Sequence, residues 1–253
     1  MQVRTSLLLA MQYRVDFLLD VLIEVVWAAT SLVPLAVVFG ARATVQGWTY
    51  PEALVVVGWF TLLQGVIEGA INPSLTTVVE HVRQGTLDFV LLKPADAQFL
   101  VSTARFQPSR AINAVTAGIL FGYAFHRIGH APTLGGVAAA VVLFTLASAT
   151  LYSLWVLTVS AAFYVVRIDN LTFLFSAVFD AARWPSTVFR GVLKVVFTFV
   201  IPLALMTTYP AEALLGRLEI MSFVQAALCA GVFAFVSRVV WVRAVGRYTS
   251  ASS

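Results

Sequence analysis

Charged residues are scarce in this sequence: they make up 11% of the 253 residues, whereas hydrophobic residues make up 60%. In soluble domains about a quarter of the residues are charged, so this chain has too little polar surface to cover a water-soluble fold. The composition therefore predicts an integral membrane protein. In a membrane protein a net charge of +4 reflects the orientation of the chain in the membrane and its contact with lipid. We therefore expect no nucleic-acid partner.

Cysteine and motifs for cofactor binding are also scarce. The single cysteine, Cys229, excludes an internal disulfide and a cysteine-based metal cluster. His81, His126 and His130 do not form a metal-binding pattern, and the sequence has no phosphate loop of the form G-x-x-x-x-G-K-[ST]. We therefore expect no cofactor and no metal in this chain; an ATP-driven activity would need ATP and Mg²⁺ on a separate subunit.

Long apolar runs are what the sequence does contain, and they predict an all-α integral membrane protein with six transmembrane helices. A helix needs about 20 apolar residues to cross the hydrocarbon core of a bilayer. The third run is short by this criterion. The predicted spans are residues 17–39, 52–71, 111–125, 134–166, 191–208 and 220–242. We expect residues 1–253 to form one transmembrane domain.

Lysine and arginine predict the orientation, because they are enriched in cytoplasmic loops. Six spans place both termini on one side of the membrane. On that side lie Arg4, Arg14, Arg83, Lys93, Arg105, Arg110, Arg167, Arg183, Arg190, Lys194, Arg243 and Arg247. On the other side lie only Arg42, Arg127 and Arg217. Arg238 lies inside the last span near its inner end, and its long side chain can extend its charge toward the cytoplasm. We therefore expect a multi-pass protein of the cell (plasma) membrane with both termini in the cytoplasm.

Two segments on the cytoplasmic side resemble neither spans nor plain loops. Residues 1–16 mix apolar side chains with arginine and glutamine, which predicts a helix lying along the inner membrane face. Residues 169–190 begin with possible helix caps and are interrupted at Trp184-Pro185. We predict that this second segment is a cytoplasmic or interfacial helical piece, either buried against protein or lying at the interface, with a turn at the proline.

The segment 85–96, GTLDFVLLKPAD, contains apolar residues that must be buried against protein, because lipid cannot cover them. Its apolar run is far too short to cross a bilayer and lies between Asp88 and Lys93. At helical spacing, one face of this segment carries Leu87, Val90 and Leu91. This face either folds back under the chain's own bundle or enters a groove on a cytoplasmic partner.

Local signals predict that this segment is a separate short helix of about two turns. Gly85 can end a helix that continues from the second span. Thr86 can cap the new helix, and Pro94 stops it.

Several sequence features occur together and in order. They are MQYRVDFLLD at the start of the first span, GTLDFVLLKPAD after the second, Trp-Pro before the fifth, and FVIPLALMTTYPAEALLG at its outer end. Together they resemble the permease subunit of type-two ABC exporters, especially a group of uncharacterised permeases encoded as separate membrane subunits. The resemblance implies six spans, an N-terminal interfacial helix and a coupling helix at residues 85–96. It also implies outer re-entrant helices between the fifth and sixth spans, which would be reduced in the short segment 209–219.

The same resemblance implies partners. The chain would pair with a second permease subunit, identical or related, and with ATP-binding cassette ATPase subunits. Membrane lipids would surround it, and the cargo would be hydrophobic or amphiphilic and moved outward. The implied ATPase-docking residues are Gly85, Leu87, Asp88, Val90, Leu91 and Lys93.

Acidic residues inside predicted spans form a second candidate site. Glu24 lies about 12 Å along the helix axis from Asp16, at 1.5 Å per residue, and Glu68 follows Gln64 by about one turn. Charges at such depth usually face protein or water. Glu24, Gln64 and Glu68 therefore either line a substrate path or proton relay, or pair with cations. The cations considered are Arg105, Arg110 and Lys194.

Two other functions remain open at this point. A proton-coupled carrier would use Glu24 and Glu68 as titrating groups and would need no ATPase. A membrane-embedded lipid-modifying enzyme would need a compact set of histidine, aspartate or serine motifs, which the loops do not show. Retention of an ATPase during purification separates the transport subunit from both.

Overall fold

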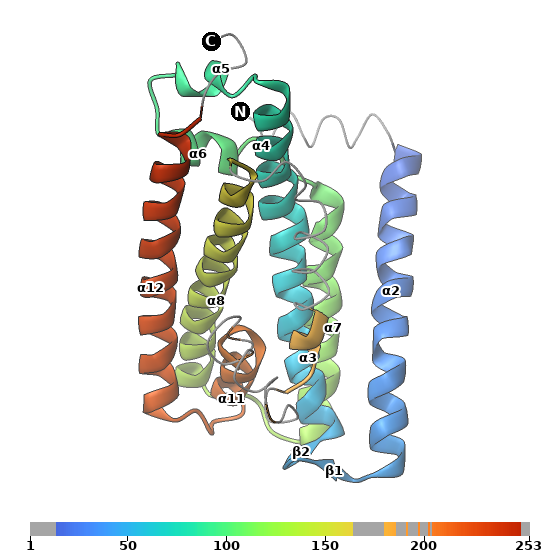
Figure 1. The fold of residues 1–253 in the computed structure, drawn as a ribbon. Helices are drawn as coiled ribbons and strands as arrows, with labels where there is room; N and C mark the ends of the chain where they lie inside the picture. Colours follow the sequence, from blue (N-terminus) through green and yellow to red (C-terminus); the bar gives the residue numbers. More distant parts are fainter. Residues whose placement is uncertain are drawn as a thin grey trace.

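The computed structural model describes residues 14–163, 180–185, 191, 197, 202 and 204–248, which form a bundle of long helices (Figure 1). The long helices are α2 (Arg14–Ala41), α3 (Tyr50–Val66), α4 (Asn72–Gln84), α7 (Ile112–Ile128), α8 (Leu134–Ser160) and α12 (Ile220–Val245). The predicted interfacial helix, residues 1–16, lies outside the described residues except for its last three, which begin α2.

Four helices in the described ranges are long and apolar enough to cross a membrane. They are Val15–Ala41, Tyr50–Gln84, Leu134–Ser160 and Ile220–Val245, and they match the first, second, fourth and sixth predicted spans. The third predicted span corresponds to α7, a helix of 17 residues. Most of the fifth, residues 191–208, lies outside the described residues, so the total of six stays a prediction.

The second spanning helix contains a π-helical segment, η1 (Ile67–Ile71), between α3 and α4. Pro73 has no backbone N–H, so it cannot donate to the carbonyl of Gly69 four residues earlier, and such positions favour local π geometry. The Gly69 carbonyl instead accepts the N–H of Gln107 at 2.8 Å. This bond fastens the chain before α7 to the middle of the helix.

Small residues allow α7 and the 3₁₀ turn before it, η2 (Pro108–Ala111), to approach the second spanning helix closely. A Cβ atom added at Gly65 would lie 3.0 Å from the Cβ of Asn113 and 3.4 Å from the carbonyl oxygen of Arg110. A Cβ atom at Gly69 would lie 3.3 Å from the Cβ of Arg110. The two glycines therefore bring Arg110 against the helix turn that carries Glu68.

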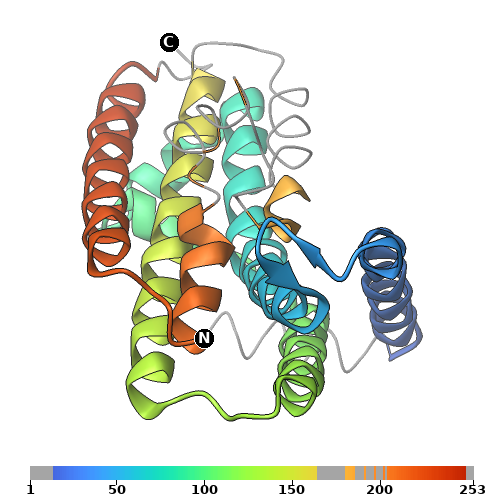
Figure 2. The same ribbon diagram turned by 90° about the horizontal axis from the view of Figure 1, so that it is seen from below.

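A two-stranded hairpin joins α2 to α3: β1 (Thr44–Val45) pairs antiparallel with β2 (Trp48–Thr49). Gln46 and Gly47 have φ angles of 52° and 82°, and two positive values are typical of the tight turn that suits the twist of a hairpin. Seen from below, the hairpin bridges α2 and the rest of the bundle (Figure 2). The sequence predicted only a short loop here.

A second short helix, α11 (Tyr209–Leu214), lies at the same end as the hairpin (Figure 1). It packs against α8 and buries Pro210, Ala211, Ala213 and Leu214. A π-helical segment, η7 (Ala204–Thr208), precedes it. The predicted short outer loop at residues 209–219 therefore contains a helix of six residues.

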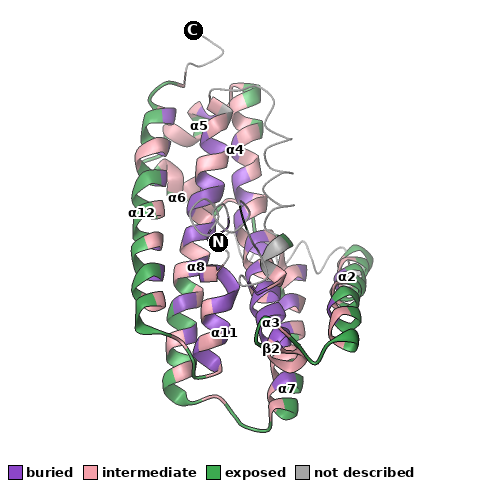
Figure 3. Cartoon of the chain, turned by 60° about the horizontal axis from the view of Figure 1, so that its bottom comes forward, coloured by how far each residue is buried: buried purple, intermediate pink, exposed green. Residues whose placement is uncertain are grey.

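Helix α2 stands at the edge of the bundle (Figures 1 and 2). Most of its large apolar side chains are exposed, as are those along α12 (Figure 3). On α2 the buried residues are Glu24 and Leu35. Exposed apolar surface of this extent on long helices fits contact with lipid.

Candidate functional site

Arg110 brings together the two acidic residues that the sequence places inside spans. Its Nη1 atom lies 2.8 Å from Oε2 of Glu68 and also forms an ion pair with Oε1 of Glu24. Gln64 donates a hydrogen bond to Oε1 of Glu68 at 3.1 Å. Of the three cations considered from the sequence, Arg110 is the one that the structure places on these carboxylates; Lys194 lies outside the described residues.

A cavity of about 650 Å³ surrounds this cluster, between α2 and the second spanning helix. Its polar wall includes Asn72, Asn113 and a second ion pair, in which Nη2 of Arg183 lies 3.0 Å from Oδ1 of Asp180. The guanidinium of Arg183 also lies 5.1 Å from the ring centroid of Phe60. The cavity therefore combines charged side chains with aromatic surface.

Of the predicted segment 169–190, the structure describes Asp180 to Pro185. The 3₁₀ turn η4 (Asp180–Arg183) lies beside α3 and lines the cavity. The place of residues 169–190 relative to the membrane stays a prediction. Asp180 and Arg183, which are three residues apart, form an ion pair with each other, and the Asp180 side chain is exposed. The rest of the segment lies outside the described residues.

The second predicted site begins where α4 ends. Gly85 has a left-handed φ of 66° and ends the helix, as predicted. The following helix α5 (Asp88–Leu91) is one turn long instead of two. Thr86 does not cap α5 with its side chain, because its hydroxyl lies 2.8 Å from Nδ1 of His81.

Burial divides the apolar residues of this segment into two groups. Leu87 is fully buried, and Val90 packs against the core, so the predicted face folds back under the bundle. Leu91 is half-buried. In contrast, Phe89 is 72% exposed and Leu92 is 81% exposed. The apolar surface available to a partner is therefore formed by Phe89 and Leu92.

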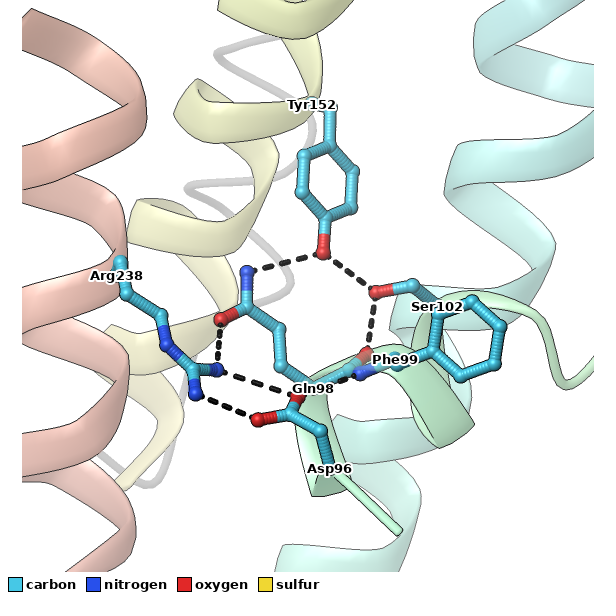
Figure 4. Close-up of polar contacts among 6 residues, drawn as sticks. All are labelled: Asp96, Gln98, Phe99, Ser102, Tyr152 and Arg238. Atoms are coloured by element: carbon cyan, nitrogen blue, oxygen red, sulfur yellow. Dashed lines mark hydrogen bonds and ion pairs between the residues drawn. The ribbon is translucent and has the colours of Figure 1, made fainter. Parts of the chain in front are cut away.

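Polar contacts tie the next helix, α6 (Ala97–Ser102), to two spanning helices (Figure 4). Arg238 of α12 donates to Oδ1 and Oδ2 of Asp96, at 3.2 and 2.5 Å, and to Oε1 of Gln98 at 2.8 Å. Gln98 donates to the hydroxyl of Tyr152 on α8 at 3.0 Å, and Ser102 lies 2.6 Å from the same hydroxyl. We call these five side chains the Arg238 network.

The carboxylate of Asp96 has two roles in this network. It accepts hydrogen bonds from Arg238, and Oδ1 also accepts the backbone N–H of Phe99 at 3.0 Å, which caps α6. The hydrogen bonds from Arg238, followed by the one from Phe99, lower the pKa of Asp96 below its ordinary value of 3.8. The ion pair is therefore fully formed at neutral pH.

The sequence did not predict the Arg238 network. Arg238 was expected to extend its charge toward the cytoplasm from the last span. Two signals were available: an arginine near the inner end of a span, and an acidic N-cap residue at Asp96. Neither signal identified the partner of the other.

Apolar spanning helices around a charged cavity define a multi-pass membrane protein. Residues 25–252 match the family model described as ABC-2 family transporter protein, and the chain belongs to this family. No curated protein and no solved structure matches the chain. The chain is thus a transmembrane ABC transporter permease, a transport component that is not itself catalytic.

Proposed function

We propose that this permease is the membrane-spanning subunit of an ATP-driven exporter whose energy comes from a separate ATP-binding cassette ATPase. The family supports a role in transport. The sequence has no phosphate loop, which supports the binding of ATP and Mg²⁺ by another chain. The observation that carries the proposal is the exposed apolar pair Phe89 and Leu92, at the end of the bundle opposite the hairpin.

This pair is suited to a groove on a soluble subunit. Residues 89 and 92 are three apart, so their side chains share one side of a helical turn. Asp88 and Lys93 flank them, as expected of a short apolar contact bordered by charge. Leu87 lies on the opposite side and fixes the segment to the bundle. The docking surface is therefore Phe89 and Leu92, and Leu87 is its internal support.

The Arg238 network supports a coupling role for the same segment. It connects residues 96–102 to α12 through Arg238 and to α8 through Tyr152. A displacement of the docked segment would be transmitted to both helices. In this proposal, ATP-driven motion of the ATPase moves the spans through these side chains.

Cargo, direction and assembly complete the proposal. The cargo is hydrophobic or amphiphilic and moves outward, and a second permease, identical or related, completes the path. Both termini are cytoplasmic. A proton-coupled carrier is less well supported, because Arg110 holds both Glu24 and Glu68 in ion pairs.

Replacing Leu92 with aspartate tests the docking surface. Burial of a leucine stabilises a contact by about 1.5–3 kcal/mol, so its loss should weaken ATPase binding by about tenfold or more. The matched control is Leu134→Asp, at an exposed leucine at the other end of the molecule. ATPase retention and ATP-dependent cargo uptake into inverted vesicles are measured on one preparation.

We expect Leu92→Asp to insert normally and to lose its ATPase and its transport, while Leu134→Asp keeps both. Leu87→Asp should instead prevent folding, because it places a charge in the core. A folded Leu92→Asp protein that retains the ATPase at wild-type stoichiometry and still transports would disprove docking at this surface.

A further inference from the structure

The charges that line the cavity do not balance among the described residues. Three carboxylates, Glu24, Glu68 and Asp180, face two guanidinium groups, Arg110 and Arg183, which leaves one negative charge in excess. Both guanidinium groups are already engaged in ion pairs. The described part of this wall thus carries net negative charge, and such a wall favours a ligand with a positive charge.

Aromatic side chains add a second attraction for a cation. Trp27, Phe60 and Trp155 line the cavity, and the faces of such rings attract positive charge. The structure contains one example, because the guanidinium of Arg183 lies over the ring of Phe60. A cavity of about 650 Å³ lies in the range that holds drug-sized molecules. Rings and volume together favour an organic cation over a bare metal ion.

A buried amide oxygen also favours the binding of a cation. Asn72 follows Glu68 by about one helical turn, and its Oδ1 atom is buried without a hydrogen-bond partner. An amide oxygen carries partial negative charge, so it adds to the attraction of Glu68 for a cation. Arg110, Arg183 and Asn113 also have buried nitrogen atoms without partners, and water can satisfy these donors without changing the charge balance.

We propose that this cavity binds an amphiphilic organic cation, whose charge lies near Glu68 and whose apolar groups lie against Trp27 and Phe60. The further statement that this cation is the transported cargo rests on the function proposed above. Arg110 keeps its pairing with Glu24, so the cation replaces only part of the pairing of Glu68.

Two ions of nearly the same shape and opposite charge test the proposal. The purified full-length chain, in lipid nanodiscs, is dialysed to equilibrium against labelled tetraphenylphosphonium or tetraphenylborate, and binding to empty nanodiscs is subtracted. We expect tetraphenylphosphonium to bind saturably, and we expect no saturable binding of tetraphenylborate. Glu68→Gln should weaken it about tenfold or more, whereas Glu80→Gln, an exposed position on α4 away from the cavity, should not change it.

Thiol protection locates the bound cation without changing Glu68. In a Cys229→Ser background, Ser31→Cys places a thiol in the cavity wall, and tetraphenylphosphonium should slow its reaction with N-ethylmaleimide. Tetraphenylborate should not slow it. If Glu68→Gln fails to fold, this protection decides whether the site exists.

The proposal is overturned if the cation shows no saturable binding, if both ions bind equally, or if folded Glu68→Gln binds as well as wild type. If tetraphenylphosphonium does not protect the thiol, the cation does not bind in this cavity. Because the permease alone is tested, these results do not depend on an ATPase. Binding and protection without ATP-driven transport would leave the site in place and overturn the function proposed for the chain.

Discussion

At the scale of single residues, Arg110 forms ion pairs with two carboxylates. It joins Glu24 on α2 to Glu68 on the second spanning helix. Ser109, beside it, donates a longer hydrogen bond to Asp20 at 3.4 Å. Because most apolar side chains of α2 point away from the bundle, these polar contacts add to the packing of Leu35 in holding α2 in place.

Arg110→Gln should therefore destabilise the protein strongly. It leaves the buried Glu24 and the half-buried Glu68 without this cation, and breaking a buried pair typically costs about 3–5 kcal/mol. The measurement is thermal unfolding in detergent, which is monitored as the loss of monodisperse protein with rising temperature. The triple variant Arg110→Gln, Glu24→Gln and Glu68→Gln should recover most of the loss, because no unpaired charge remains. A single variant that unfolds at the wild-type temperature would show that the pairs contribute little.

At the scale of helices, two glycines and one proline determine how the cluster is assembled. Gly65 and Gly69 let α7 and its preceding turn approach the second spanning helix. Pro73 leaves the Gly69 carbonyl free to accept the N–H of Gln107. Backbone geometry therefore positions Arg110 before its side chain forms any ion pair.

Gly65→Leu should separate α7 from the second spanning helix. The new side chain has no space beside Asn113 and Arg110, and overpacking typically costs about 1–3 kcal/mol. Gly118→Leu is the matched control, because nothing lies within 4 Å of a Cβ at that position on α7. Thermal unfolding of the two variants side by side is the measurement. Equal unfolding temperatures would contradict close packing at Gly65.

The sequence predicted those helices whose signals are local. Apolar runs indicated the positions of α2, α8 and α12, and Gly85 indicated the end of α4. Pairing across the bundle was not predictable, because the sequence carries no information on which cation meets which carboxylate. Asp96 and Arg238 are 142 residues apart and come together only in the fold.

At the scale of the whole molecule, the two ends of the bundle differ. One end carries α5, α6 and the last turn of α12, and the other carries the hairpin and α11 (Figure 1). Along the described chain, α2, the second spanning helix, α7 and α8 run in alternating directions (Figure 1). The orientation in the membrane follows from the distribution of lysine and arginine and stays a prediction.

Site-directed labelling tests this orientation. With Cys229 replaced by serine, single cysteines are introduced at Thr44, an exposed position in the hairpin, or at Ser250 near the C-terminus. In intact cells a membrane-impermeant thiol reagent should label the Thr44 variant and leave the Ser250 variant unlabelled. Both should react after the membrane is made permeable. The reverse pattern in intact cells would invert the topology.

The Arg238 network also has a consequence for the order of events during synthesis. Asp96 leaves the ribosome 142 residues before Arg238, a delay on the order of ten seconds at common rates of translation. Until the final helix has been inserted, the segment that we propose as the ATPase-docking surface lacks its anchor on α12. A nascent or truncated permease would thus present the docking surface to the ATPase without its anchor on α12, and we expect the proposed transporter to assemble on completed chains.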